Sequence, residues 1–295
     1  MGFEQCHPGL NLIFFSVALY TTCTFDHPVF LAISLLCGFI YSIKRNRVKA
    51  LALNIVLLLS AAGFALYYSS YNHFGITVLD QNLIGNNITL ESLAYGAVLG
   101  VKVLSFVIWF SCVYSVFSSD KVVYLFGRIA PALSLCLSIL LRLVPEICSQ
   151  AKRINSARRG IGRGTGQGNI IRRISNLISL ISMLITRTIE MLIQTSASMK
   201  SRGSGLKGRT AYSIYRFDSR DRAYVIAVFF CMSLMLMGML LGQTEAVYDP
   251  MIRISKPTSM SYLFYIGYFA FCMMPLGLEC ATEYSFYRSR KSLKS

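Results

Sequence analysis

The chain has 295 residues, of which 54% are hydrophobic, and its formal net charge is +16. That hydrophobic content is too high for an ordinary soluble domain. The basic residues alternate with long apolar segments instead of covering one face of a polar protein, which argues against a nucleic-acid-binding protein.

The first third of the chain predicts a helical hairpin followed by two membrane spans. Apolar segments at 10–23 and 29–43 flank the tetrapeptide Phe25-Asp26-His27-Pro28. Each segment is shorter than the roughly 20 residues that cross a bilayer, so we expect the two to form a tight hairpin. Residues 50–70 and 92–117 are apolar over a full membrane thickness and are predicted spans.

The span at 92–117 carries two informative features. Gly96 and Gly100 form a pair of small residues four positions apart, which favours close packing of two helices. Lys102 lies well inside the span. A charge at that depth indicates either a functional residue or a lysine that faces the bundle interior and extends its stem toward the outer interface.

The segment 118–222 is the most basic part of the chain and holds 18 of the 29 Lys and Arg residues. Residues 129–147 are almost wholly apolar, and apolar residues recur at three- and four-residue steps through 171–185, which is typical of an amphipathic helix. A glycine-rich turn lies between them at 160–168. We therefore predict two or three long helices, apolar along one face and basic at their ends.

Two further spans are predicted at 223–241 and 261–278. The predicted fold is therefore all-α, a polytopic membrane helical bundle with a basic cytoplasmic coupling unit of long amphipathic helices. We expect three parts: N-terminal transmembrane helices at 1–117, the coupling helices at 118–222, and C-terminal transmembrane helices with a basic tail at 223–295.

The distribution of charge in the loops predicts the orientation. Lys and Arg in short loops mark the cytoplasmic side of a membrane protein. Residues 44–49 contain four basic residues, 71–91 contain none, and the tail after residue 287 contains four. This pattern predicts a cell-membrane protein that crosses the bilayer an even number of times, with both termini in the cytoplasm. The segments 129–144 and 177–193 either lie at the bilayer surface or cross it.

The polar residues do not form a pattern that indicates catalysis. The nine cysteines are scattered without a Cys-x-x-Cys pair, and the three histidines are far apart. The sequence has no phosphate-binding loop and no cluster of a nucleophile with a base. We therefore expect a protein that is not an enzyme and that holds no metal ion or cofactor of its own.

Two arginine–glycine pairs follow long helical patterns within the basic segment. They are Arg159-Gly160 and Arg202-Gly203. An arginine in the last turn complements the helix dipole, and a glycine just past the end can adopt the left-handed conformation that caps a helix. Arginine also binds carboxylates through two parallel hydrogen bonds. Two such ends are therefore candidate docking points for acidic grooves on two copies of a partner.

The pairs belong to a larger set of motifs between Lys121 and Asp221. The set consists of Lys121–Gly127, Pro131, Leu141–Glu146, Gln150-Ala151, Arg159-Gly160, Ser198–Gly203, Gly208–Thr210, Phe217 and Asp221. As a whole it resembles the CbiQ-like family, the transmembrane T component of energy-coupling factor (ECF) transporters. The rest of the chain resembles that family in hydropathy only.

The family signature is Ala-Arg-Gly, used twice, and the resemblance implies that each copy docks one ATPase. In this chain Arg158 stands in the alanine place of the first copy and Ser201 in that of the second. Both Arg158 and Arg159 are therefore candidates for the first contact. The implied docking residues are Arg158, Arg159, Gly160, Ser201, Arg202 and Gly203.

The resemblance further implies a scaffold with three kinds of partner: two ABC ATPase subunits, a separate membrane subunit (the S component) that captures a vitamin or a metal ion, and the lipid bilayer. In that mechanism ATP hydrolysis moves the helices that carry the arginines. We expect the faces that carry Leu135, Leu177, Ile181 and Leu184 to pack against the capture subunit, because an amphipathic helix must bury its apolar stripe.

Two alternative functions would require features of a different kind. A self-contained secondary transporter would need discontinuous helices and polar groups at the midplane, ideally in repeats. Lys102 is the one charge deep in a confident span, and no repeat is evident. A membrane-bound lipid- or phosphate-transfer enzyme would need clustered acids or histidines, which Asp26, His27 and Asp80 do not form.

Overall fold

The computed structural model describes residues 3–72, 75–81, 87–204, 206, 215, 217, 219–255 and 257–292. The chain divides into two compact units. One consists of Met1–Ser118 together with Tyr215–Ser295, and the other of Ser119–Ile214. The motif residues Gly208–Thr210 lie outside the described residues.

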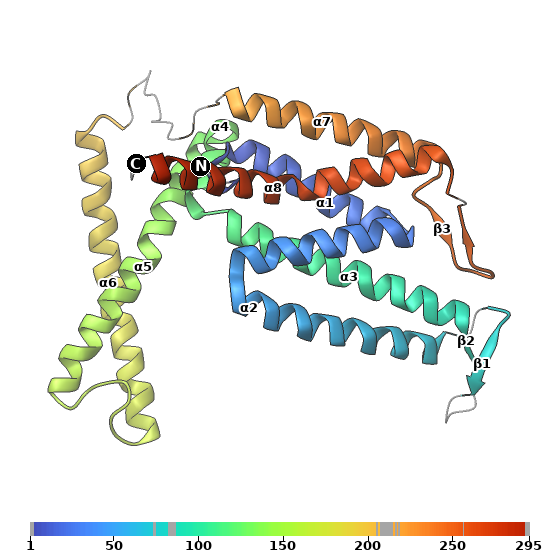
Figure 1. Cartoon of the computed structure of the whole chain (residues 1–295). Helices are drawn as coiled ribbons and strands as arrows, with labels where there is room; N and C mark the ends of the chain where they lie inside the picture. The colour runs from blue at the N-terminus through green and yellow to red at the C-terminus, as the bar shows by residue number, and fades with distance from the viewer. Residues whose placement is uncertain are drawn as a thin grey trace. The chain divides into compact units, whose positions relative to one another are not determined.

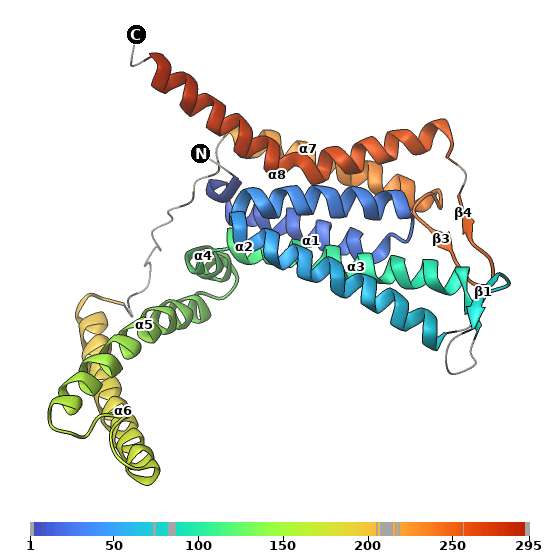
Figure 2. The same ribbon diagram turned by 60° about the horizontal axis from the view of Figure 1, so that its bottom comes forward.

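The first unit is a bundle of long helices that lie along one another (Figures 1 and 2). Its helical elements are the short 3₁₀ turn η1 (Phe3–Gln5), α1 (Pro8–Thr24), α2 (Pro28–Tyr71), α3 (Leu90–Val116), α7 (Ser219–Leu240) and α8 (Ser259–Ser292). The four residues 219–222, predicted to belong to the basic middle segment, form the first turn of α7.

The predicted hairpin at the N-terminus is formed by α1 and the first half of α2. Both helices begin in the same way: a histidine precedes a proline, and its ring accepts a hydrogen bond from the backbone N–H two residues on. These histidines are His7, which accepts from Gly9, and His27, which accepts from Val29. Proline suits the first helical position because its missing N–H is not needed there.

The predicted loop at 44–49 is a kink instead of a loop. Helix α2 runs through both halves of this region, and its helical geometry is broken at Arg47, where φ is 52° and ψ is −129°. The kink separates an apolar half at Pro28–Arg47 from a second at Ala50–Tyr71. The predicted spans at 50–70 and 92–117 therefore correspond to the second half of α2 and to α3.

Two short antiparallel hairpins, which the hydropathy pattern does not predict, lie at one end of the bundle (Figures 1 and 2). They are β1 (Val78–Gln81) with β2 (Asn87–Thr89), and β3 (Ala246–Val247) with β4 (Arg253–Ile254). The turn between α1 and α2 joins this end, because the backbone N–H groups of Asp26 and His27 both donate to the Thr244 carbonyl at 3.2 and 3.1 Å.

The core of the first unit is aromatic. Phe3, Phe14, Trp109 and Phe271 are fully buried and pack edge-to-face or tilted against their neighbours, with the rings of Phe14 and Phe271 only 4.8 Å apart. The indole N–H of Trp109 donates to the Ser34 hydroxyl at 3.0 Å, so its one polar group is satisfied inside the apolar core.

The second unit contains α4 (Ser119–Ile129), α5 (Pro131–Gly160) and α6 (Ile170–Ser201), which confirms the prediction of two or three long helices. Helix α4 folds back on the start of α5, where the Ser134 hydroxyl donates to the Val123 carbonyl at 2.9 Å. Helices α5 and α6 cross each other (Figure 1). No side chain of α6, which is described throughout, is buried.

Seven helical segments within the described residues are long and apolar enough to cross a bilayer. Five belong to the first unit and the other two are α5 and α6. The prediction of an all-α polytopic membrane protein is confirmed. Length and composition alone admit both a surface position and a crossing for α5 and α6.

Helices α2 and α3 approach closely at the two predicted glycines. A Cβ atom added to Gly100 would lie 2.9 Å from the Ala61 carbonyl oxygen, and one added to Gly96 would lie 3.0 Å from that of Ala65. Both neighbours are backbone atoms, so a side chain at either position has to push the helices apart.

Gly100→Ala should therefore destabilise the bundle by about 1–3 kcal/mol, the usual cost of overpacking a close contact. Thermal unfolding of the purified protein in detergent measures the change. Gly63→Ala is the matched control, because Gly63 lies in the same helix pair and has nothing within 4 Å of an added Cβ atom. Equal melting temperatures for the two variants would contradict the close contact.

Candidate functional site

The two arginine ends lie at opposite ends of the α5–α6 pair. Helix α5 ends in Arg158, Arg159 and Gly160, and α6 ends at Ser201 with Arg202 as its C-cap. The side chain of Arg158 reaches Ser179 of α6, and Arg202 is 23 residues further along that helix. At 1.5 Å per residue, the two ends are therefore roughly 35 Å apart along α6.

Both helices end in the same hydrogen-bonded cap, but the glycine that makes the first cap is not the predicted one. At the end of α6, Gly203 has φ +74°, and the N–H groups of Gly203 and Ser204 donate to the carbonyls of Lys200 and Met199 at 3.0 Å each. This is the Schellman arrangement, in which two orphan carbonyls are satisfied. The predicted role of Gly203 as a capping glycine is thus confirmed.

At the end of α5 the left-handed residue is Gly162, with φ +75°, whereas Gly160 is the last residue of the helix. The N–H of Arg163 donates to the Arg158 carbonyl at 2.9 Å, and that of Gly162 donates to the Arg159 carbonyl at 3.2 Å. The prediction that Gly160 caps α5 was wrong, because the helix continues through Gly160 and the glycine-rich turn offers a second glycine two residues later.

Arg158 and Arg159 have different surroundings. The guanidinium of Arg158 donates to the Ser179 hydroxyl at 2.9 Å, to the Asn176 amide oxygen at 3.5 Å and to the Arg163 carbonyl at 3.2 Å. Arg158 therefore ties the end of α5 to α6. Arg159 is exposed, and its guanidinium makes no hydrogen bond or ion pair to another residue that the structure describes.

The turn between α5 and α6 is held by polar side chains. The Asn155 amide oxygen accepts from both the backbone N–H and the hydroxyl of Thr165, at 3.1 and 3.2 Å. The Asn176 amide donates to the Gly164 carbonyl at 3.2 Å, which joins the same turn to α6. Despite its five glycines, the segment 160–168 is therefore an ordered turn that fixes where α5 ends.

The second arginine end borders an open groove. The groove has a volume of about 650 Å³ and lies between the first half of α5 and the last third of α6. Its wall includes Arg142, Glu146, Met199 and Arg202. Glu146 accepts a hydrogen bond from Gln150 at 3.2 Å, and the hydroxyl of Ser201 donates to the Ser198 carbonyl at 2.8 Å. The substitution of serine for alanine before Arg202 thus leaves the helix end intact.

The predicted apolar stripe is only partly exposed. Leu135, Leu177 and Ile181 are exposed at 39%, 48% and 44%. Leu184 is half-buried, and it lies on the same row of α6 as Thr188 and Met191. The sulfur of Met191 accepts a hydrogen bond from Gln150 of α5, so this row faces the neighbouring helix. Leu184 therefore belongs to the contact between the two helices more than to a free surface.

Lys102 forms an ion pair that the sequence did not indicate. Its ammonium lies 2.5 Å from the carboxylate of Asp26, in the turn between α1 and α2. The lysine thus faces the bundle interior, which agrees with the second interpretation of a charge at this depth and not with a free functional residue. The Tyr248 hydroxyl donates to the Asp26 carbonyl at 3.1 Å, and burial, together with the charge of Asp26, raises the pKa of that phenol.

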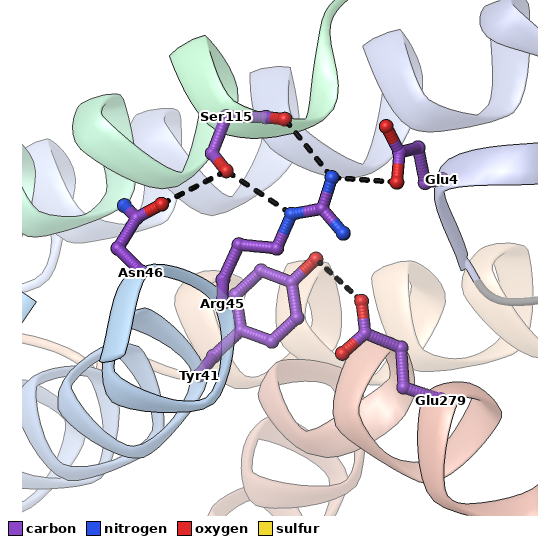
Figure 3. Close-up of polar contacts among 6 residues, drawn as sticks. All are labelled: Glu4, Tyr41, Arg45, Asn46, Ser115 and Glu279. Atoms are coloured by element: carbon purple, nitrogen blue, oxygen red, sulfur yellow. Dashed lines mark hydrogen bonds and ion pairs between the residues drawn. The ribbon is translucent and has the colours of Figure 1, made fainter. Parts of the chain in front are cut away.

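A second polar network lies at the end of the first half of α2, beside the kink, and was also missed (Figure 3). Arg45 pairs with Glu4 at 2.6 Å and donates two hydrogen bonds to Ser115, at the end of α3. The Tyr41 hydroxyl donates to Glu279 of α8 at 3.4 Å. No spacing in the sequence signals this network, because its members come from four separate segments.

The described residues contain no group of three or more His, Cys, Asp or Glu side chains placed to hold a metal ion. All nine cysteines are free, and four of them are buried in the first unit.

His27 lies in the turn beside Asp26, and its ring is 3.3 Å from the Tyr265 hydroxyl. Burial lowers the pKa of this histidine.

Comparison with known proteins identifies a family. Residues 8–212 match the model of the CbiQ family, described as a cobalt transport protein. Curated relatives include three proteins described as energy-coupling factor transporter transmembrane protein EcfT. That of Lactococcus lactis subsp. cremoris is 31% identical over 97 residues, which are 32% of this chain and 36% of the relative.

The EcfT protein of Lacticaseibacillus paracasei is 33% identical over 90 residues, 30% of this chain and 34% of the relative. That of Streptococcus thermophilus is 30% identical over 100 residues, 34% of this chain and 38% of the relative. The aligned part thus spans about a third of the length of these relatives, whereas the family match extends over both arginine ends.

Proposed function

Because the chain belongs to the CbiQ family, we propose that it is the transmembrane coupling subunit of an ATP-driven importer of the ECF type. In this role it links two ABC ATPases to a separate membrane subunit that captures a vitamin or a metal ion. The relatives described as EcfT, which are transmembrane proteins of such transporters, support this role. The chain itself is a scaffold and not an enzyme.

The observation that carries the proposal is the pair of capped arginine ends on one crossed helix pair. The two ends share the same cap, lie roughly 35 Å apart along α6 and present exposed arginines. A pair of docking points at that spacing suits two copies of one partner. We propose Arg159 and Arg202 as the docking residues, with Arg158 holding α5 and α6 together.

The alternative, a secondary transporter with its own substrate site, is less well supported. Such a site needs polar groups that are free to bind a substrate near the midplane. Lys102, the one candidate found in the sequence, is paired with Asp26 in a turn at the end of the bundle. The positive charge of Lys102 is therefore neutralised by Asp26 and is not free to bind a substrate.

The position of α5 and α6 follows from the same role. We propose that they lie on the cytoplasmic side, at the bilayer surface, with both termini of the chain in the cytoplasm of a cell-membrane protein. Eight Lys and Arg residues and no acidic residue occur between 147 and 189, which is the composition expected of a cytoplasmic segment. The apolar faces of both helices are then covered by the capture subunit or by lipid.

Replacing both docking arginines should uncouple the chain from its ATPases. Arg159→Ala and Arg202→Ala each remove a charge-assisted contact, which typically costs about 2–5 kcal/mol at an interface. We expect each variant to lower the yield of ATPases that co-purify with the chain, and the double variant to abolish it. Arg187→Ala is the control, because that arginine is also exposed but lies mid-helix beside Glu190.

A double variant that retains the ATPases at the wild-type yield would show that docking lies elsewhere. Arg158→Ala has a separate expected result. Since Arg158 bonds to Ser179 and Asn176, its loss should loosen the α5–α6 turn and weaken docking less than the loss of Arg159. The reverse order would assign the contact to Arg158.

Charges placed on the exposed apolar stripe should block the capture subunit selectively. We expect Leu177→Asp combined with Ile181→Asp to lower binding of that subunit and to leave ATPase binding unchanged, because the arginine ends are elsewhere. Leu184 is left intact, since it is half-buried on the row of α6 that includes Met191. Ser175→Asp with Ser182→Asp adds the same charge to another exposed face and is the control. Loss of the ATPases with retention of the capture subunit would reverse the assignment of the two surfaces.

Cysteine accessibility should establish the orientation. In a cysteine-free background, Thr165→Cys should react with a membrane-impermeant maleimide only after the cells are opened, and Asn86→Cys should react in intact cells. The native cysteines have to be removed because Cys23, Cys136, Cys148 and Cys280 are exposed. Asn86 lies outside the described residues and is placed by the charge pattern alone. Labelling of Thr165→Cys in intact cells would contradict the cytoplasmic position.

A further inference from the structure

Arg45 occupies a particular place in the first unit. It lies at the end of the first half of α2, two residues before the kink at Arg47. Figure 3 shows its guanidinium pointing toward both the end of α3 and the N-terminal turn η1. Only 24% of its side chain is exposed, so its contacts are partly shielded from water and screened less than those of a surface arginine.

Two hydrogen bonds join Arg45 to the end of α3. Its Nε donates to the Ser115 hydroxyl at 3.0 Å, and its Nη2 donates to the Ser115 carbonyl at 3.2 Å. The same hydroxyl donates to the Asn46 amide oxygen at 3.1 Å, so its position is fixed from two sides. A planar guanidinium can make both contacts at once, which a lysine ammonium cannot do with the same geometry.

The Ser115 carbonyl needs such a partner. It is one of the last four carbonyls of α3, which have no hydrogen-bond partner within the helix. A positive charge at this place also complements the negative end of the helix dipole. Helix ends fray where these groups are unsatisfied. Arg45 therefore stabilises the last turn of α3 in particular, rather than the helix as a whole.

The last turn of α3 is also the point where the chain leaves the first unit. The first unit extends to Ser118, and the second begins at Ser119, three and four residues after Ser115. The chain passes between the two units here and again at Tyr215, so this is one of the two places at which a force applied to α5 and α6 reaches the membrane unit along the chain. Helix α3 is held along its length by the close contact of Gly96 and Gly100 with α2, and at its end by Arg45.

The arginine is itself held on its other side. Glu4 pairs with it at 2.6 Å, and the neighbouring Phe3 is fully buried among the aromatic residues of the core. One turn earlier in α2, the Tyr41 hydroxyl donates to Glu279 of α8. The end of α3 is thus joined through Arg45 to the N-terminal turn and through α2 to α8, three elements that do not themselves lead to the second unit.

We propose that Arg45 is a positioning residue, which holds the end of α3 still while the ATPases move the coupling helices. Without it, the last turn of α3 unwinds under load and absorbs the movement before it reaches the membrane helices. This inference rests on the proposed function, since the load comes from ATPases bound at the arginine ends.

Amide hydrogen exchange of residues 113–118, in the complex with the ATPases and the capture subunit, tests the proposal without a known substrate. In Arg45→Gln we expect these amides to exchange faster during ATP hydrolysis than in the nucleotide-free complex. The expected increase is roughly 2- to 30-fold, the range that changes in a coupling network produce. The wild-type complex should show equal exchange in both states.

Three further variants support the measurement. Arg45→Lys keeps the charge beside Glu4 but loses the forked contact with Ser115, so it should show an intermediate increase during hydrolysis. Lys44→Gln is the matched control, because Lys44 is the adjacent basic residue and pairs instead with Glu283 of α8 at 2.8 Å. Lys44→Gln should behave as the wild type. If Arg45→Gln does not assemble, Ser115→Ala removes only the hydroxyl contact and should show the same effect at smaller size.

The dependence on nucleotide separates positioning from simple stabilisation. If exchange at 113–118 rises by the same factor with and without ATP hydrolysis, Arg45 only stabilises the fold and the proposal is wrong. No increase in either state also overturns it. If the wild-type chain does not bind the ATPases, the proposed function is contradicted instead. That result is obtained when the wild-type complex is assembled, before any variant is compared.

Discussion

The bilayer does not supply hydrogen bonds, and most of the first unit follows from that constraint. Each backbone N–H and C=O in the hydrocarbon has to be satisfied within its own segment, which allows helices and excludes open strands. The described apolar segments of this unit are accordingly long and helical, and its two β hairpins lie at the end of the bundle, beyond these segments. The break at Arg47 is also placed beside polar and charged side chains.

The same constraint explains which features were predictable. The spans, the α1–α2 hairpin and the amphipathic helices follow from hydropathy, which responds directly to the bilayer. The Gly96–Gly100 contact follows from residue size, because only small residues let two helices approach closely. The family also could be inferred from the sequence, since its motifs lie within one continuous segment.

Features that depend on the pairing of distant residues could not be predicted. Lys102 pairs with Asp26, and Arg45 contacts Glu4 and Ser115, because helices far apart in the sequence pack together. The prediction that Gly160 caps α5 failed for a local reason. The glycine-rich turn offers several residues able to adopt positive φ, and Asn155 and Asn176 hold that turn through polar contacts with Thr165 and Gly164 that the sequence does not reveal.

Helix α6 has a further consequence for the cell that makes this protein. All of its 32 residues are described, and none is buried within the chain. Apolar surface of this extent must be covered by lipid or by another protein at every stage. Copies synthesised in excess of their partners then present that surface to chaperones and proteases, which remove incompletely assembled proteins. The abundance of the subunit is thereby tied to the supply of its partners, without any dedicated regulator.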